Sequence, residues 1–353
     1  THLLSLADAR AGKIPLRWTE YTPVKPAMLG TKIFDDYPLG ELVSYIDWTP
    51  FFMAWELPGR YPEILTYKHL GDQAKKLFED ANTLLDRIVK DGLLHARAVF
   101  GIFRANTVGD DIELFSDDSR KTVMATLRHL RQQKEKLPGK SSACLSDFVA
   151  PKESGVADYM GAFAVTAGFG LDEFAAECQK RHDDYTSIMA KALADRLAEA
   201  LAERMHERVR KEFWGYADKE RMGKDALLKE EYAGIRPAPG YPACPDHTEK
   251  GTLWRLLDVE KSIGLRLTES FAMTPTAAVS GWYFAHPESY YFGVGKIGRD
   301  QVEDYARRKG MTVAEVERWL APNLHYEPKT QGLVTGDVRY RTSGTSQNSA
   351  VQL

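Results

Sequence analysis

The chain has 353 residues, of which 43% are hydrophobic and 27% are charged, and its formal net charge is −3 at pH 7. This composition is typical of a globular protein that can bury a large core without disulfides or a structural metal. A nearly neutral charge gives no reason to expect a nucleic acid or a membrane surface as a partner.

The three cysteines, Cys144, Cys178 and Cys244, are far apart and lack CxxC spacing, which indicates a reducing compartment and argues against a zinc cluster. The sequence contains neither a signal peptide nor an apolar run of about 18 residues, so we expect a cytoplasmic protein. The chain begins at Thr1 without a methionine, and residues 1–26 are interpreted as a loop-like linker. We therefore expect a piece of a longer chain, with removal of a short leader as the alternative.

The N-terminal half alternates helical and strand patterns. Residues 38–56 combine a helix-like start with an aromatic cluster, and residues 70–90 have the apolar spacing of an amphipathic helix. Residues 95–115 predict a strand, a tight turn and a second strand. Residues 118–136 are predicted to form a helix with a basic outer face, and residues 160–168 a buried strand.

A long helical arm is predicted over residues 171–214. An apolar residue recurs every four positions along it, at Met189, Leu193, Leu197, Leu201, Met205, Val209 and Phe213. Roughly 200° around the helix lies an acidic face, made of Asp195, Glu199, Glu203 and Glu207. This face could be an ordinary solvated surface or a docking face for a partner or ligand, and the pattern alone favours the solvated surface.

The C-terminal part predicts short helices at 225–231 and 252–264, then two antiparallel strands within residues 265–297. Two helices follow at 300–309 and 313–319, the second with Thr312 as its N-cap, and residues 329–353 are predicted to be a disordered tail. Because the strands occur in hairpin pairs and not in a βαβ alternation, the fold class is α+β with an antiparallel sheet.

Several short stretches partly match known functional motifs but lack the residues or the structural context that those motifs require. Residues 293–298 read GVGKIG, but the helix after them is followed by another helix, where a dinucleotide fold needs a strand. His206 and Glu207 begin an HExxH pattern that lacks its second histidine, and no GxSxG is present. Neither a metalloprotease nor a serine hydrolase is therefore indicated.

The loop at residues 236–247 is the strongest candidate site. Pro237, Pro239 and Pro242 fix the backbone and remove three donors, so the loop is pre-shaped. Gly240 permits close approach to the backbone, and Arg236 offers a planar fork suited to a carboxylate. Such a loop could hold a small zwitterionic ligand. The alternative is a stiff connecting loop with Arg236 in a structural salt bridge, and composition alone favours this alternative.

At this loop the chain resembles the reactivation domain of cobalamin-dependent methionine synthase. The resemblance runs from about Tyr21 to Tyr326, although the glycine-rich GVGKIG departs from the family pattern. It implies a single C-shaped α+β domain over residues 27–328, with a twisted antiparallel sheet flanked by helices. The segments that carry it are YIDWTPFF, FGIFRANTVGDDI, HERVRKEFWGYA, GIRPAPGYPACPDHTEK, LTESFAM and AVSGWYFAHPESYYFGVGKI.

The resemblance also implies a binding site for S-adenosylmethionine. Position by position, Arg236 corresponds to the carboxylate-binding arginine and Asp47 to a group at the amino-acid or amine end. The full set of implied ligand contacts is Asp47, Glu230, Arg236, Ala238, Gly240, Tyr241, Tyr291 and Phe292, and the last two are expected on a strand, formed by residues 290–292, that borders the ligand. Implied contacts with the cobalamin-bearing module are Asp195 and Glu199, together with His247 at the end of the loop.

The family's role is to restore methylcobalamin from cob(II)alamin, with a methyl group from S-adenosylmethionine and an electron from flavodoxin or a flavoprotein reductase. No catalytic residue is expected in this chain, because the family uses the domain for positioning and water exclusion. The cobalamin-binding motif and the cysteine-rich zinc site for homocysteine are absent from this sequence, so the chain is expected to need its other modules and to be monomeric. Rival classes are a stand-alone methyltransferase and a pure interaction module.

Overall fold

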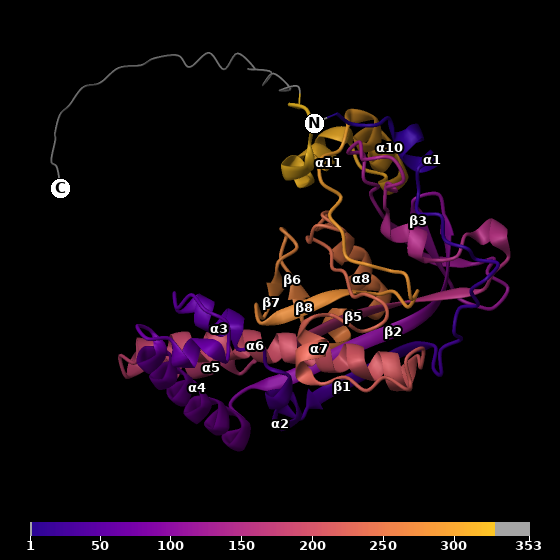
Figure 1. The fold of residues 1–353 in the computed structure, drawn as a ribbon. Helices are drawn as coiled ribbons and strands as arrows, with labels where there is room; N and C mark the ends of the chain where they lie inside the picture. Colours follow the sequence, from indigo (N-terminus) through magenta and orange to yellow (C-terminus); the bar gives the residue numbers. More distant parts are fainter. Residues whose placement is uncertain (1, 329–353) are drawn as a thin grey trace, which may run out of the picture.

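An antiparallel sheet of six strands forms the centre of the structure, which is a computed structural model describing residues 2–328 (Figure 1). The strand order is β4-β3-β2-β5-β8, and β1 pairs with the first half of β2 on the same edge that β3 occupies further along. A separate two-stranded ribbon is made by β6 and β7. The bounds are β1 Gly30–Tyr37, β2 His95–Val108, β3 Asp111–Phe115, β4 Val123–Arg128, β5 Asp158–Phe169, β6 Arg266–Leu267, β7 Met273–Thr274 and β8 Ala278–Tyr283.

Strands β2 and β5 are the long central pair, and both are buried along almost their whole length. They read as near-continuous apolar runs because helices cover both faces of the sheet at this point. The predicted hairpin over residues 95–115 is confirmed, with Gly109 at φ +63° in its turn. The predicted buried strand over residues 160–168 is likewise confirmed within β5.

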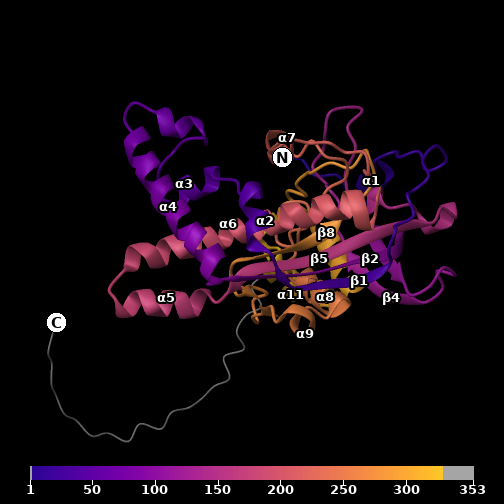
Figure 2. The same ribbon diagram turned by 90° about the horizontal axis from the view of Figure 1, so that it is seen from below.

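Helices form two layers around this sheet, with α6 on one face and α8 and α9 on the other (Figure 2). In Figure 1 the outline is that of a C, whose lower limb is made by α3 to α6 and whose upper limb is made by α10 and α11. The predicted fold class, a single C-shaped α+β domain with an antiparallel sheet, is confirmed. The bounds are α1 Leu6–Ala11, α2 Leu39–Leu42, α3 Thr49–Ala54, α4 Gly71–Asp91, α5 Leu171–Lys180, α6 Asp184–Arg208, α7 Lys224–Leu228, α8 Glu249–Leu257, α9 Val259–Ile263, α10 Arg299–Lys309 and α11 Val313–Trp319.

The helical arm predicted over 171–214 is broken into two helices that pack against each other. The break follows Lys180, and Asp183 then caps α6 by accepting a hydrogen bond from the Thr186 amide at 3.0 Å. After α6 the chain continues as a π-helical segment, Val209–Phe213. The apolar stripe is buried as predicted, except that Phe213 is only partly buried. Among residues 2–328, no helix combines the length and the apolar character needed to cross a bilayer.

Three local predictions are wrong. Residues 118–136 contain strand β4 where a helix was expected, because residues 123–128 pair with β3 and so complete the sheet. The N-terminal segment 1–26 contains the helix Leu6–Ala11, capped by Ser5. Residues 290–292 were read as part of a strand but run as irregular chain. The Thr312 N-cap is confirmed by its capping box with Glu315, and the predicted tail 329–353 lies outside the described residues.

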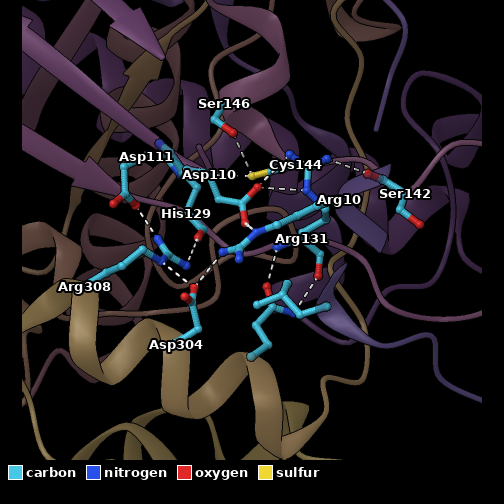
Figure 3. Close-up of polar contacts among 12 residues, drawn as sticks. Arg10, Asp110, Asp111, His129, Arg131, Ser142, Cys144, Ser146, Asp304 and Arg308 are labelled. Carbon is cyan, nitrogen blue, oxygen red and sulfur yellow. Dashed lines mark hydrogen bonds and ion pairs between the residues drawn. The ribbon is translucent and has the colours of Figure 1, made fainter. Parts of the chain in front are cut away.

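A buried ion cluster joins the N-terminal helix, the sheet and the C-terminal helices (Figure 3). The side chain of Arg131 is 2% exposed, and its two terminal nitrogens donate to the two carboxylate oxygens of Asp147 at 2.8 Å. The Nε of Arg131 donates to Asp110 at 2.8 Å. Arg10 on α1 bridges Asp110 and Asp304 at 2.7 Å each, and Asp304 also pairs with Arg308 on α10. The cluster therefore ties residues near both ends of the described chain to the β2–β3 turn.

Removing one carboxylate of this cluster should cost stability in a pH-dependent way. Burial alone would raise the pKa of Asp110, but Arg131 and Arg10 lower it below its usual value. A depressed pKa stabilises the fold above the ordinary carboxyl pKa of about 4, and this stabilisation is lost as the pH falls through the folded-state value. We expect Asp110→Asn to lower the free energy of unfolding by about 3 kcal/mol or more at pH 7, because it leaves Arg131 buried with less compensation.

Urea denaturation at several pH values tests this expectation. The difference in the free energy of unfolding between wild type and Asp110→Asn should become smaller as the pH drops below about 4. A matched control is Asp86→Asn on α4, where the carboxylate is exposed and should contribute little at any pH. If the difference in the free energy of unfolding between wild type and Asp110→Asn stayed constant down to pH 3, the stabilising role assigned to the charge of the Asp110 carboxylate would be contradicted.

Candidate functional site

The proline-rich loop extends the sheet beyond the end of β8. Ile235 exchanges two backbone hydrogen bonds with Phe284, both of 3.0 Å, and the Pro237 carbonyl accepts from the Trp282 amide at 2.9 Å. Proline cannot donate to a sheet ladder but can accept, so Pro237 fits this edge position. The loop is therefore fixed to β8 by backbone bonds on both sides of Arg236.

Tight turns shape the second half of the loop. Gly240 has φ +92°, and its amide donates to the Cys244 carbonyl at 2.7 Å. A side chain at Gly240 would meet the His247 imidazole, since a Cβ there would lie 2.4 Å from its ring. The sequence suggested that Gly240 allows a ligand to approach the backbone closely. In the structure, the positive φ angle and the contact with His247 explain the glycine.

A cavity of about 470 Å³ opens against this loop, within the size range of small-molecule sites. Six of the eight predicted ligand contacts line it, and Glu199 on α6 lines it too. Gly240 and His247 face each other and are not part of its lining, and Asp195 is exposed nearby on α6. The full lining is Glu199, Glu230, Arg236, Pro237, Ala238, Tyr241, Pro242, Ala243, Val279, Tyr291 and Phe292.

Asp47 lies in a smaller adjoining cavity of about 170 Å³. Glu199, Glu230 and Arg236 line both cavities, so the two adjoin at these side chains. One Asp47 oxygen accepts from the Thr49 amide at 3.0 Å, which holds the carboxylate at the start of α3. The structure therefore brings Asp47 to the region of the predicted site, on the side where the acidic residues gather.

Arg236 is held by an ion pair that the sequence analysis left open as an alternative. Its Nη2 donates to Glu203 at 2.8 Å, and the backbone amide of Arg236 donates to the Tyr291 hydroxyl at 3.0 Å. Burial opposes the guanidinium charge, but Glu203 and the phenols of Tyr232 and Tyr291 outweigh it, and the pKa of Arg236 is raised. The arginine stays protonated under all ordinary conditions.

The aromatic side chains that line the cavity, Tyr291 and Phe292, come from the irregular segment after β8. Tyr291 also exchanges a hydrogen bond with Tyr232 at 3.2 Å, and burial raises the pKa of the Tyr291 phenol. The amide of Val294 donates to the Pro242 carbonyl at 2.8 Å, which fastens this segment to the loop. Tyr291 and Phe292 were predicted on a strand, but this fastening, and not strand pairing, places them at the cavity.

The acidic face of α6 is not uniformly solvated. Exposure falls along the helix from Asp195, whose side chain is 55% exposed, to Glu203 at 10%. Glu207 pairs with Lys211 at 3.2 Å and receives a hydrogen bond from Tyr45. The solvated-surface interpretation is therefore wrong for Glu203 and Glu207. Glu203 and Tyr232 were not predicted as site residues, although Glu203 continues the four-residue repeat of Asp195 and Glu199.

A larger cavity, of about 860 Å³, lies between β4, α8 and α11. Its side chains include Arg255, Phe271 and Trp319, and none of the predicted site residues is among them. Its buried ionic groups satisfy one another, as in the pairs of Lys309 with Asp246 and Glu249. We place the functional site at the smaller cavity because convergent polar groups, more than volume, mark a binding site. Within residues 2–328 no metal-ligand cluster is found.

Gly281 on β8 provides a test of how tightly the loop is seated. A Cβ at this position would lie 2.6 Å from the Pro237 carbonyl oxygen, too close without moving the loop. We expect Gly281→Ala to lower the free energy of unfolding by about 1–3 kcal/mol, as overpacking does. Gly223→Ala is the control, because a Cβ there meets nothing within 4 Å. Equal thermal stability of the two variants would show that the loop is not held where the structure places it.

Comparison with known proteins shows the family and supports the fold. Residues 38–310 match the family described as vitamin B12 dependent methionine synthase, activation domain. A crystal structure of the MetH reactivation domain bound to AdoHcy is 56% identical in sequence, with a TM-score of 0.90 over 93% of this chain and 100% of that chain. The match spans more than half of the chain, and the chain belongs to the family of vitamin B12-dependent methionine synthase activation domains.

Proposed function

We propose that the cavity beside the proline-rich loop binds S-adenosylmethionine, and that the domain presents its methyl group for the reactivation of cobalamin. The observation that carries this proposal is the convergence of a buried arginine, aromatic side chains and carboxylates on one cavity. The crystal structure of the similar MetH domain, described as bound to AdoHcy, supports the same ligand class.

The charges of the site suit each end of this ligand. Arg236 offers a charged fork to the α-carboxylate, and Asp47 offers a carboxylate to the ammonium group. Glu199 and Glu230 place negative charge along the cavity that would receive the positive sulfonium. Because the sulfonium charge diminishes as the S–C bond breaks in the transition state, we assign these carboxylates to affinity and orientation and not to rate.

The remaining walls suit an adenosine. Tyr291 and Phe292 offer flat aromatic surface to the cavity, and Pro237, Ala238 and Pro242 add further apolar lining. We propose that backbone groups of the loop near Ala238 contact the rings. No general base is required, because methyl transfer from a sulfonium needs no proton removal, and the contribution of the protein is orientation and exclusion of water.

We propose that a cobalamin held by another module approaches this domain at the mouth of the cavity. Tyr241 is 62% exposed there, and the carboxylates of Asp195 and Glu199 lie on the neighbouring face of α6. When bound, cobalamin supplies a nucleophilic cobalt centre that takes the methyl group. We propose that Asp195 and Glu199 help to dock the cobalamin-binding module of the same polypeptide, with His247 at the edge of this surface, and that the electron comes from flavodoxin or a flavoprotein reductase.

Calorimetric titration with S-adenosylmethionine tests the ligand proposal. We expect saturable one-to-one binding, weakened at least tenfold, or about 1.4 kcal/mol, by Arg236→Ala. The matched control is Arg255→Ala, which removes an exposed arginine from the other large cavity and should leave affinity unchanged. Absence of binding at millimolar ligand by folded wild type would rule out this site and favour a pure interaction module.

The docking proposal has its own test in the full-length enzyme. Asp195→Asn and Glu199→Gln together should lower the fraction of molecules in which this domain sits on the cobalamin module, as measured by cross-linking. A contact can bias that equilibrium only if it is made in one state and not in the other. Asp86→Asn on α4 is the control for loss of an exposed carboxylate. An unchanged cross-linked fraction in the double variant would refute the role of these residues in docking.

A further inference from the structure

Glu203 is the ionic partner of Arg236, and the resemblance assigned it no role. The two side chains are 10% and 16% exposed, and the bond joins α6 to the loop that follows α7. Helix α6 packs on β5 and β8, so the carboxylate of Glu203 projects from a rigid support. The inference below rests on the proposed function, because it concerns how Arg236 meets a ligand.

The ion pair leaves most of the guanidinium unused. The Arg236 side chain binds Oε2 of Glu203 through Nη2 at 2.8 Å, and the Tyr232 hydroxyl also interacts with the guanidinium. The Nε of Arg236 and the Oε1 of Glu203 are buried and find no hydrogen-bond partner among the described residues. A guanidinium carries five N–H donors in a planar fork, so one carboxylate bound at a single point leaves an edge for a second carboxylate.

The position of Arg236 also needs an explanation. A long arginine side chain without an ionic partner can adopt several rotamers, and each would present the guanidinium differently. The bond to Glu203 selects one of them before any ligand arrives. Binding is then stronger for a carboxylate that meets the free edge, because the side chain is already ordered.

We propose that Glu203 is a positioning residue that fixes the Arg236 guanidinium so that its free edge receives the carboxylate of the ligand's amino-acid end. The geometry of the acceptor oxygen is what matters in this role. A role through charge alone would be different, because the negative charge of Glu203 lies close to the incoming carboxylate and would repel it. The cavity also holds Glu199 and Glu230, which can attract a cationic ligand without Glu203.

The test compares two ligands that differ only at the carboxylate, S-adenosylmethionine and its decarboxylated analogue. The measured quantity is the ratio of their dissociation constants. Wild type should favour S-adenosylmethionine at least tenfold, and Arg236→Ala should remove this preference. Glu203→Ala should reduce the preference for S-adenosylmethionine to less than about threefold. The dissociation constant of the decarboxylated analogue should change less than that of S-adenosylmethionine. A general structural defect would weaken both ligands alike.

Two conservative variants separate geometry from charge. Glu203→Gln keeps an acceptor oxygen at the same reach and should retain the preference for the carboxylate within about threefold. Glu203→Asp keeps the charge but is one methylene shorter, so Arg236 must move and the preference should fall. Glu212→Gln is the control, since Glu212 is exposed on the same helical arm and pairs with Arg208.

The outcomes distinguish this inference from the proposed function. A preference that survives in Glu203→Asp but is lost in Glu203→Gln would overturn positioning in favour of charge. A preference unchanged or increased in all three Glu203 variants would overturn any positioning role while leaving the site intact. Failure of wild type to bind S-adenosylmethionine, or an Arg236→Ala variant with wild-type preference, would overturn the proposed function itself.

Discussion

Burial of the central strands β2 and β5 on both faces is the constraint on which the rest of the structure depends. Covering one face requires α6, and covering the other requires α8 and α9. The free edge of β5 is closed by β8, and the proline-rich loop continues along β8. The cavity therefore lies where three supports meet, namely the sheet edge, the acidic side of α6 and the aromatic segment after β8. A site so placed is pre-organised, because its walls belong to elements that the core already holds.

The sequence predicted those elements whose pattern follows from burial. The strands at 95–115 and 160–168 and the apolar stripe of α6 were found because apolar spacing records which face is covered. Residues 118–136 were misassigned, because pairing with β3 decides their conformation and local spacing does not. The break before α6 did have a local signal, Asp183 followed by Thr186, but the apolar spacing on either side masked it.

The site was predictable in a different way. Composition alone favoured a structural salt bridge as the explanation of Arg236, and only the segments shared with a known family pointed to a ligand. The structure shows that the salt bridge exists and that Arg236 nevertheless lines the cavity. Glu203 escaped prediction because its partner is 33 residues away, and no local pattern reports such a contact. Tyr232 was not predicted for a similar reason, because its contact with the site is a hydrogen bond to Tyr291, which is distant in the sequence.

Four carboxylates at equal spacing on α6 turn out to occupy different environments. Asp195 is exposed, Glu199 borders the cavity, Glu203 is buried against Arg236 and Glu207 is bound by Tyr45 and Lys211. Burial raises the pKa of Glu203 even though Arg236 opposes the rise, so keeping this group ionised has a cost in folding. A well-packed apolar pair could replace a purely structural ion pair at little loss. An ion pair beside a cavity differs from such a structural pair, because an ordered guanidinium can there meet a ligand, as we propose for Arg236, whereas an apolar side chain could not.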